Sequence, residues 1–148
     1  MVNRYPYFDG LPQSKLDCAL GKSCPANPTY ASQFEIDILA SRFAVENLYG
    51  VGAAEYIYFS NKDNFFVTET GWPSCGTSGS MSGSNTNLIT YNENAIRDVE
   101  TGGALEDVVG KLFLFEAHDE ENKPPPPVPC GGCQKCWGLM YENGTIKN

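Results

Sequence analysis

The sequence has few basic residues and a single histidine, and these shortages exclude several classes of protein. Lysine and arginine number 10 against 18 aspartates and glutamates, which gives a net charge of −8. An acidic chain repels phosphate backbones and anionic lipids, so neither nucleic acid nor a membrane surface is expected as a partner. His118 alone cannot build a hydrolytic triad, and we interpret it as a packing residue. A neutral sugar polymer is compatible with this charge.

The chain also lacks long apolar runs. No stretch reaches the roughly 18 apolar residues of a membrane span, and the N-terminal residues have neither the basic nor the apolar region of a signal peptide. Yet six cysteines favour an oxidising compartment, and Asn143 lies in an Asn-Gly-Thr glycosylation sequence that only a secretory route would use. We therefore expect an extracellular or cell-wall protein whose start lies upstream of Met1.

The apolar residues make up 41% of the chain, and their spacing predicts an alternation of strands and helices. Such a βαβαβ order predicts an α/β fold with a parallel sheet. The near-continuous apolar run of the last strand predicts cover on both of its faces. The expected strands are 2–8, 65–68 and 111–117, and the expected helices are about 32–49 and 87–99.

Two further segments carry predictions of their own. Apolar residues are expected to recur at helical spacing in the first helix, and its two aromatic residues of this set, Phe34 and Phe43, are expected in the core. The set is Phe34, Ile38, Ala40, Phe43, Val45 and Leu48. Residues 74–84 consist almost wholly of glycine and serine, which predicts a flexible surface loop.

Polar residues mark the end of each predicted strand, where parallel α/β folds place their working groups. Carboxylates can protonate a leaving oxygen or attack an anomeric carbon, and aromatic rings stack on sugars, so the combination suits a carbohydrate site. A solvated or ion-paired role is the simplest interpretation of Glu116, Asp119 and Glu121. The first strand offers Asn3, Tyr5 and Tyr7, and the second offers Glu69 followed by Trp72.

Several motifs carry a specific resemblance. Residues 67–74 read Val-Thr-Glu-Thr-Gly-Trp-Pro-Ser, residues 3–8 read Asn-Arg-Tyr-Pro-Tyr-Phe, and residues 115–120 read Phe-Glu-Ala-His-Asp-Glu with Lys123 beyond. Residues 3–8 resemble the sixth strand of family-17 glycoside hydrolases, the β-1,3-glucanases, residues 67–74 resemble the seventh, and residues 115–120 resemble the eighth. Trp-Gly-Leu at 137–139 resembles the family's closing segment. The eighth-strand motif is of the fungal or oomycete type, with His118 in place of the usual phenylalanine.

The resemblance implies a partial (β/α)8 barrel, or TIM barrel, comprising strands six to eight with their helices. Residues 1–123 would be the C-terminal half of that barrel, 124–136 a Pro/Cys-rich insertion and 137–148 the closing segment. Glu69 would be the nucleophile of a retaining, double-displacement cleavage of β-1,3-glucan that needs no metal or cofactor. The residues implied to bind substrate are Asn3, Tyr5, Trp72, Glu120 and Lys123.

The family's acid/base glutamate, which lies in a Gly-Asn-Glu sequence, has no counterpart here. A barrel normally takes about 250 residues, so we expect another chain or an N-terminal segment to complete it. Two hypotheses follow. The protein is an active glucan hydrolase or transglycosylase, or it is a structural or glucan-binding wall protein derived from one.

The cysteines also leave alternatives open. Cys18 and Cys24 are the easiest local disulfide pair, and we expect the other four to form disulfides in an order that the spacing does not determine. The alternative is a metal site in which Cys130, Cys133 and Cys136 supply three thiolates and Cys75 or His118 supplies the fourth ligand. The remaining candidates for disulfides are Cys75, Cys130, Cys133 and Cys136.

Overall fold

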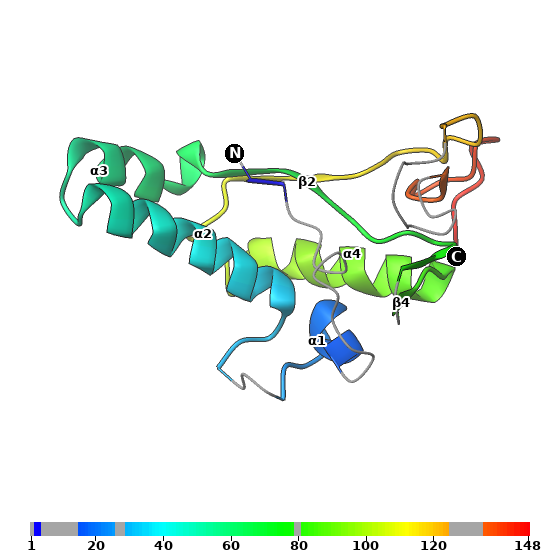
Figure 1. Cartoon of the computed structure of the whole chain (residues 1–148), viewed down its shortest axis with the longest axis horizontal. Helices are drawn as coiled ribbons and strands as arrows, with labels where there is room; N and C mark the ends of the chain where they lie inside the picture. Colours follow the sequence, from blue (N-terminus) through cyan, green and yellow to red (C-terminus); the bar gives the residue numbers. More distant parts are fainter. Residues whose placement is uncertain (1, 4–14, 26–28, 79–80, 125–134) are drawn as a thin grey trace.

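The computed structural model describes residues 2–3, 15–25, 29–78, 81–124 and 135–148 (Figure 1). Its main sheet has three parallel strands in the order β1 (Val2–Asn3), β2 (Phe66–Thr70) and β5 (Lys111–Leu114). The parallel α/β prediction is therefore confirmed. The rest of the first predicted strand, including Tyr5, lies outside the described residues.

Two long helices connect these strands, and both begin at a serine. Ser32 caps α2 (Gln33–Tyr49) and Ser84 caps α4 (Asn85–Val99), each by accepting a hydrogen bond from a backbone N–H of the first turn. Ser32 also donates to the Asp98 carboxylate over 2.8 Å, so the cap of one helix is joined to the end of the other. Both predicted helices are confirmed.

Shorter helices fill the connections. α1 (Leu16–Ala19) precedes α2, while α3 (Ala54–Ser60) packs against α2 and leads through a short 3-10 turn, η3 (Lys62–Asn64), into β2. The sequence left open whether residues 56–59 extend the first helix. They belong to the separate helix α3.

The core lies between the strands and the two long helices, which Figure 1 shows on the same side of β2. Val67 of β2 contacts a cluster that contains Phe34 and Ile38 of α2 and Tyr91 and Ala95 of α4. These helix residues recur every three or four positions, so each helix presents one apolar stripe to the sheet.

Two predictions about burial are wrong. Phe43 is 55% exposed, because nine residues are about two and a half turns of a helix and place it on the face of α2 opposite Phe34, so only Phe34 of the predicted pair is buried. Phe113 of β5 is 52% exposed, so the last strand is not covered on both faces. Helices cover one face of this sheet, and the periodicity of a single element does not reveal how far its neighbours extend.

The predicted flexible loop at 74–84 contains regular structure. β3 (Thr77–Ser78) and β4 (Met81–Ser82) pair antiparallel, and the N–H of Gly83 donates to the carbonyl of Gly76 over 2.8 Å. The glycine and serine content indicated a surface segment but not that its two arms would pair.

Candidate active site

Glu69 lies near the carboxyl end of β2, between two neighbouring strands. Its register partner on one side is Asn3 of β1, so the two residues predicted to act together are adjacent across the sheet. On the other side, the N–H of Phe115 donates to the carbonyl of Thr70 over 2.7 Å, which brings the segment after β5 to the same end. The carboxyl ends of β1, β2 and β5 therefore lie at one edge of the sheet. The side chain of Glu69 is partly buried there.

Gly71 permits this close approach of β2 and the segment after β5. A Cβ atom at that position would lie 2.3 Å from the carbonyl oxygen of Phe115 and 3.5 Å from the Trp137 ring. Backbone oxygen cannot withdraw without moving the strand end, so glycine is the residue that fits in the Glu-Thr-Gly-Trp sequence.

Trp72 is in the core. Its side chain is 1% exposed, and its ring centroid lies 5.6 Å from that of Tyr91. The Tyr91 hydroxyl in turn shares a 2.6 Å hydrogen bond with Thr70, the residue after Glu69. The tryptophan thus supports the end of β2 from the helix side. Sequence reasoning expected it to shape a sugar subsite, and the structure places its ring under the site rather than in an open cleft.

Glu116, Glu120 and Lys123 form a charged cluster beside β5. The Lys123 ammonium group donates to the Glu120 carboxylate, lies 3.8 Å from Oε2 of Glu116 and stands 4.8 Å above the Phe115 ring. Burial raises the pKa of Glu116 to about 7, although the charge of Lys123 opposes the shift and the charge of Glu120 adds to it. The hydrogen bond from Lys123 lowers the pKa of Glu120.

Sequence reasoning found Glu120 and Lys123 but missed the unusual state of Glu116. A signal was present, because Glu116 interrupts an apolar run that begins in β5. Its backbone is held on both sides by the closing segment: its N–H donates to Trp137, and its carbonyl accepts from Leu139. Only 15% of its side chain is exposed and it is paired with Lys123, so of the two roles expected for Glu116, solvated or ion-paired, the structure shows the ion-paired one.

A second, buried ion pair lies next to this cluster. The Lys147 ammonium nitrogen is 2.6 Å from Oδ1 of Asp119 and 2.7 Å from Oγ of Ser74. The same Asp119 oxygen also accepts from the N–H of Gly138 over 3.0 Å. Ser74 follows the Trp-Pro sequence, so this network joins the loop after β2 to the segments after β5. Glu121, by contrast, is exposed.

Two disulfides are present in the described residues. Cys18 is bonded to Cys24, as the sequence predicted for the local pair, and Cys75 is bonded to Cys136. Because the sulfur of Cys75 is in a disulfide, its use as a metal ligand is ruled out in this structure. Cys130 and Cys133 lie outside the described residues. Over the described ranges, no three side chains are grouped as metal ligands would be.

The remaining predicted positions are at the surface. His118 is exposed, so the expectation that it is a packing residue is wrong. Asn143 is also exposed, and its side-chain oxygen accepts from the N–H of Thr145. Glycosylation there stays a prediction. Among the described residues, none of the helices has the length and apolar character that crossing a membrane requires.

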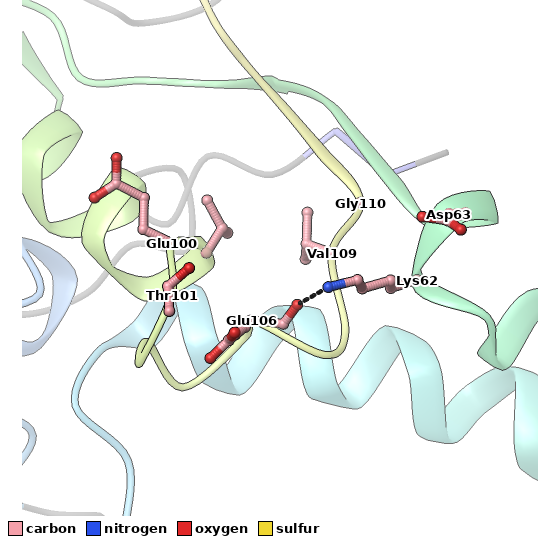
Figure 2. A pocket seen from close by; sticks show the side chains of 8 residues that line it. Lys62, Asp63, Glu100, Thr101, Glu106, Val109 and Gly110 are labelled. Carbon is pink, nitrogen blue, oxygen red and sulfur yellow. Dashed lines mark hydrogen bonds between the residues drawn. The ribbon is translucent and has the colours of Figure 1, made fainter.

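A cavity of about 500 Å³ lies at the opposite end of the sheet (Figure 2). Its lining includes Lys62 and Asp63 of η3, just before β2, and Gly110, just before β5. The ammonium group of Lys62 donates to the carbonyl oxygen of Glu106 over 3.2 Å. These residues precede the strands, whereas parallel α/β barrels use the residues that follow them, so we do not assign the active site to this cavity.

A parallel sheet covered by helices, with Glu69 and the Glu116–Glu120–Lys123 cluster at the carboxyl ends of its strands, is the arrangement of the (β/α)8-barrel class. The chain matches the family described as glycosyl hydrolases family 17 over residues 1–147, and it belongs to that family. The family and the solved structures below imply a TIM-barrel fold, of which the described residues form a part.

The relatives are β-1,3-glucan enzymes by name. The chain is 31% identical over 160 residues to glucan endo-1,3-beta-glucosidase 3 of Arabidopsis thaliana, covering 98% of this chain and 29% of that protein. It is similar in structure to a β-1,3-glucanase and allergen of Cryptomeria japonica pollen, with a TM-score of 0.72 and 26% identity, covering 97% of this chain and 42% of the other. A Rhizomucor miehei β-1,3-glucanosyltransferase shares the fold, with a TM-score of 0.55 and 20% identity over 98% of this chain and 39% of its own. The chain thus spans less than half the length of each.

Proposed function

We propose that this chain supplies the nucleophile half of a retaining β-1,3-glucan hydrolase or transglycosylase, and that Glu69 is the nucleophile. The observation that carries the proposal is the position of Glu69 in β2, next to Asn3 and opposite the segment that bears Glu120 and Lys123. Family membership supports the reaction class. On this proposal β1, β2 and β5 are the sixth, seventh and eighth strands of the barrel, and residues 124–136 are an insertion between the barrel half (1–123) and the closing segment (137–148).

In the proposed double-displacement reaction, each of the predicted site residues has a role. The Glu69 carboxylate attacks the anomeric carbon, the glycosidic bond breaks, and the departing oxygen takes a proton from an acid outside this chain. Water or a sugar hydroxyl then attacks the anomeric carbon of the glycosyl–enzyme and gives its proton to the same outside group, which now acts as a base. The bond to Glu69 breaks, the free carboxylate is restored, and the outcome is hydrolysis or transfer. Glu120 and Lys123 bind sugar hydroxyls, Asn3 and Tyr5 complete the subsite, and Trp72 holds the strand end that carries Glu69.

We propose that further polypeptide completes the barrel. An apolar groove of about 390 Å³ lies between α4 and β5, and the side chain of Phe113 stands exposed on β5. Apolar surface of this kind requires cover by another layer. The groove is lined mainly by Leu88, Ile89, Ile96, Leu114, Leu139, Met140 and Ile146. The disulfides and the glycosylation sequence at Asn143 support an extracellular or cell-wall location.

A second candidate is a non-catalytic glucan-binding wall protein. It is favoured by one observation, the proline run at 124–127 followed by a dense group of cysteines, which a hydrolase does not need for its reaction. A retaining glycosidase needs two carboxyl groups about 5–5.5 Å apart, and without the second one a bound glucan would not be cleaved.

The experiment that separates the candidates uses a substrate that does not need the acid. A dinitrophenyl β-laminaribioside releases a stable phenolate, so the nucleophile alone can form the glycosyl–enzyme. We expect a burst of one dinitrophenolate per chain and a matching mass increase on the peptide that contains Glu69. The variant E69Q should show neither, while the control E55Q on α3 should behave as wild type. Binding of laminarin without a burst would support the non-catalytic protein.

A further inference from the structure

Glu116 occupies a position that the proposed function does not use. It follows β5 by two residues, and its backbone forms two hydrogen bonds with the closing segment. Its N–H donates to the carbonyl of Trp137, and its carbonyl accepts from the N–H of Leu139. The position of Glu116 is therefore set by β5 and by the closing segment. Its Oε2 lies 3.8 Å from the Lys123 ammonium nitrogen, and the same ammonium group donates to Glu120, so the two carboxyl groups meet at one cation.

The second carboxyl oxygen of Glu116 indicates the protonation state. Oε1 is buried and has no hydrogen-bond partner among the described residues. A full negative charge in that environment would be costly, because one oxygen would lose its hydration and gain nothing in return. A neutral carboxyl group fits the environment better, and its proton can be donated to the neighbouring Glu120 carboxylate.

We propose that Glu116 is a positioning residue for the proposed reaction: it shares one proton with Glu120, and this shared proton leaves Lys123 bound to Glu120 at the edge that holds Glu69. When Glu116 loses the proton, two carboxylates repel each other and compete for one ammonium group. Glu120 and Lys123 then lose their fixed orientation. The inference rests on the proposed function for its catalytic consequence, but not for the shared proton itself.

Other charged groups approach Glu116 from each neighbouring element. On its own segment, Asp119 adds negative charge that favours the neutral form, and this charge is largely engaged by Lys147 of the C-terminal segment. Lys135 contacts the cluster through its backbone, where its carbonyl accepts from the N–H of Glu120. Among the described residues whose charges act on the pair, Lys123 is the cation.

The shared proton is tested without any reaction. With ¹³C-labelled glutamate in the chain, NMR follows each carboxyl carbon through a pH titration, and loss of a signal in E116Q identifies Glu116. We expect a midpoint near 7 in the wild type, which matches the raised pKa of this group. The variant E120Q should lower the midpoint by about one unit or more, K123M should raise it, and the control E121Q should leave it unchanged. A midpoint near 4.5, or one that E120Q does not move, would overturn the inference.

The positioning role is tested by measuring, as a function of pH, how fast the dinitrophenyl β-laminaribioside labels Glu69. The second-order rate constant of the wild type should fall above pH 7 by about tenfold per unit, as expected for loss of one proton. E116Q should retain the low-pH rate and lose this decline, because its amide can still donate to Glu120. A decline that persists in E116Q would overturn the positioning role. If no label forms in any variant, the assignment of Glu69 fails, and the titration still decides the shared proton.

Discussion

Asp119 and Lys147 form an ion pair of 2.6 Å in which the lysine side chain is 0% exposed. The pair connects parts of the chain that are 28 residues apart, and the hydroxyl of Ser74 joins it from the loop after Glu69. Removal of one partner of a buried ion pair leaves the other charge uncompensated and is strongly destabilising. The pair therefore holds the end of β2 against the closing segment.

We predict that removal of one partner of this pair is costly. K147M should lower the free energy of unfolding by about 3–5 kcal/mol, because it leaves the Asp119 carboxylate without its cation. The double variant K147M/D119L should recover a large part of this loss, because neither charge is then left unpaired. Urea unfolding followed by circular dichroism measures both. A loss below about 1 kcal/mol in K147M would show that the pair is solvated.

The raised pKa of Glu116 predicts a dependence of stability on pH. Between pH 4.5 and about 7 the unfolded chain has released this proton and the folded chain keeps it. The free energy of unfolding therefore falls as pH rises through this interval, by at most about 3 kcal/mol for a shift of this size. Above the interval, this group causes no further change. E116Q should abolish this decline and be more stable than wild type at pH 8.

The lowered pKa of Glu120 acts with the opposite sign. Its stabilising contribution is present above the ordinary pKa of a glutamate and is lost as pH falls through the lowered value. The two effects occupy different pH intervals. Equilibrium unfolding of wild type, E116Q and E120Q at pH 4, 6 and 8 separates them, and equal pH dependence in all three would contradict the assignment.

Gly71 should not tolerate a side chain. In G71A the new methyl group would meet the Phe115 carbonyl oxygen at 2.3 Å, so the two strand ends must separate. We expect a loss of about 2–3 kcal/mol, with reduced labelling of Glu69. The control G144A has a positive φ but no neighbour within 4 Å, so only conformational strain of about 1 kcal/mol applies there. Equal losses in the two variants would show that β2 and the segment after β5 are not in close contact.

The two disulfides should contribute unequally. Cys75–Cys136 closes a loop with a sequence separation of 61, and Cys18–Cys24 one of 6. Chain-entropy arguments give about 4 kcal/mol for the first and about 2 kcal/mol for the second. The paired variants C75S/C136S and C18S/C24S, compared by thermal unfolding, measure this order. A larger loss in C18S/C24S would mean that the long connection is already constrained by other contacts.

Local patterns predicted much of this fold. Apolar spacing predicted α2 and α4, and the alternation of elements predicted the parallel sheet. The apolar set was wrong about Phe43, because this residue lies about two and a half turns after Phe34 and therefore on the opposite face of α2.

The candidate site divides in the same way. Glu69 was found from its motif, and its adjacency to Asn3 follows from parallel pairing. The state of Glu116 was missed, because it depends on Trp137 and Lys123, which contact it only in the folded chain. Lys147 was missed for a related reason: in the sequence it is an ordinary residue of a polar tail, and only folding brings it to Asp119.

The central claim, that Glu69 is the nucleophile, is tested most directly by locating the covalent sugar. After reaction with the dinitrophenyl β-laminaribioside, the chain is quenched in acid, digested, and sequenced by mass spectrometry. The account predicts one laminaribiosyl group per chain on the Glu69 side chain, absent from E69Q and unchanged in E55Q. A laminaribiosyl group on Glu116, Glu120 or any other residue, with Glu69 unmodified, would contradict it.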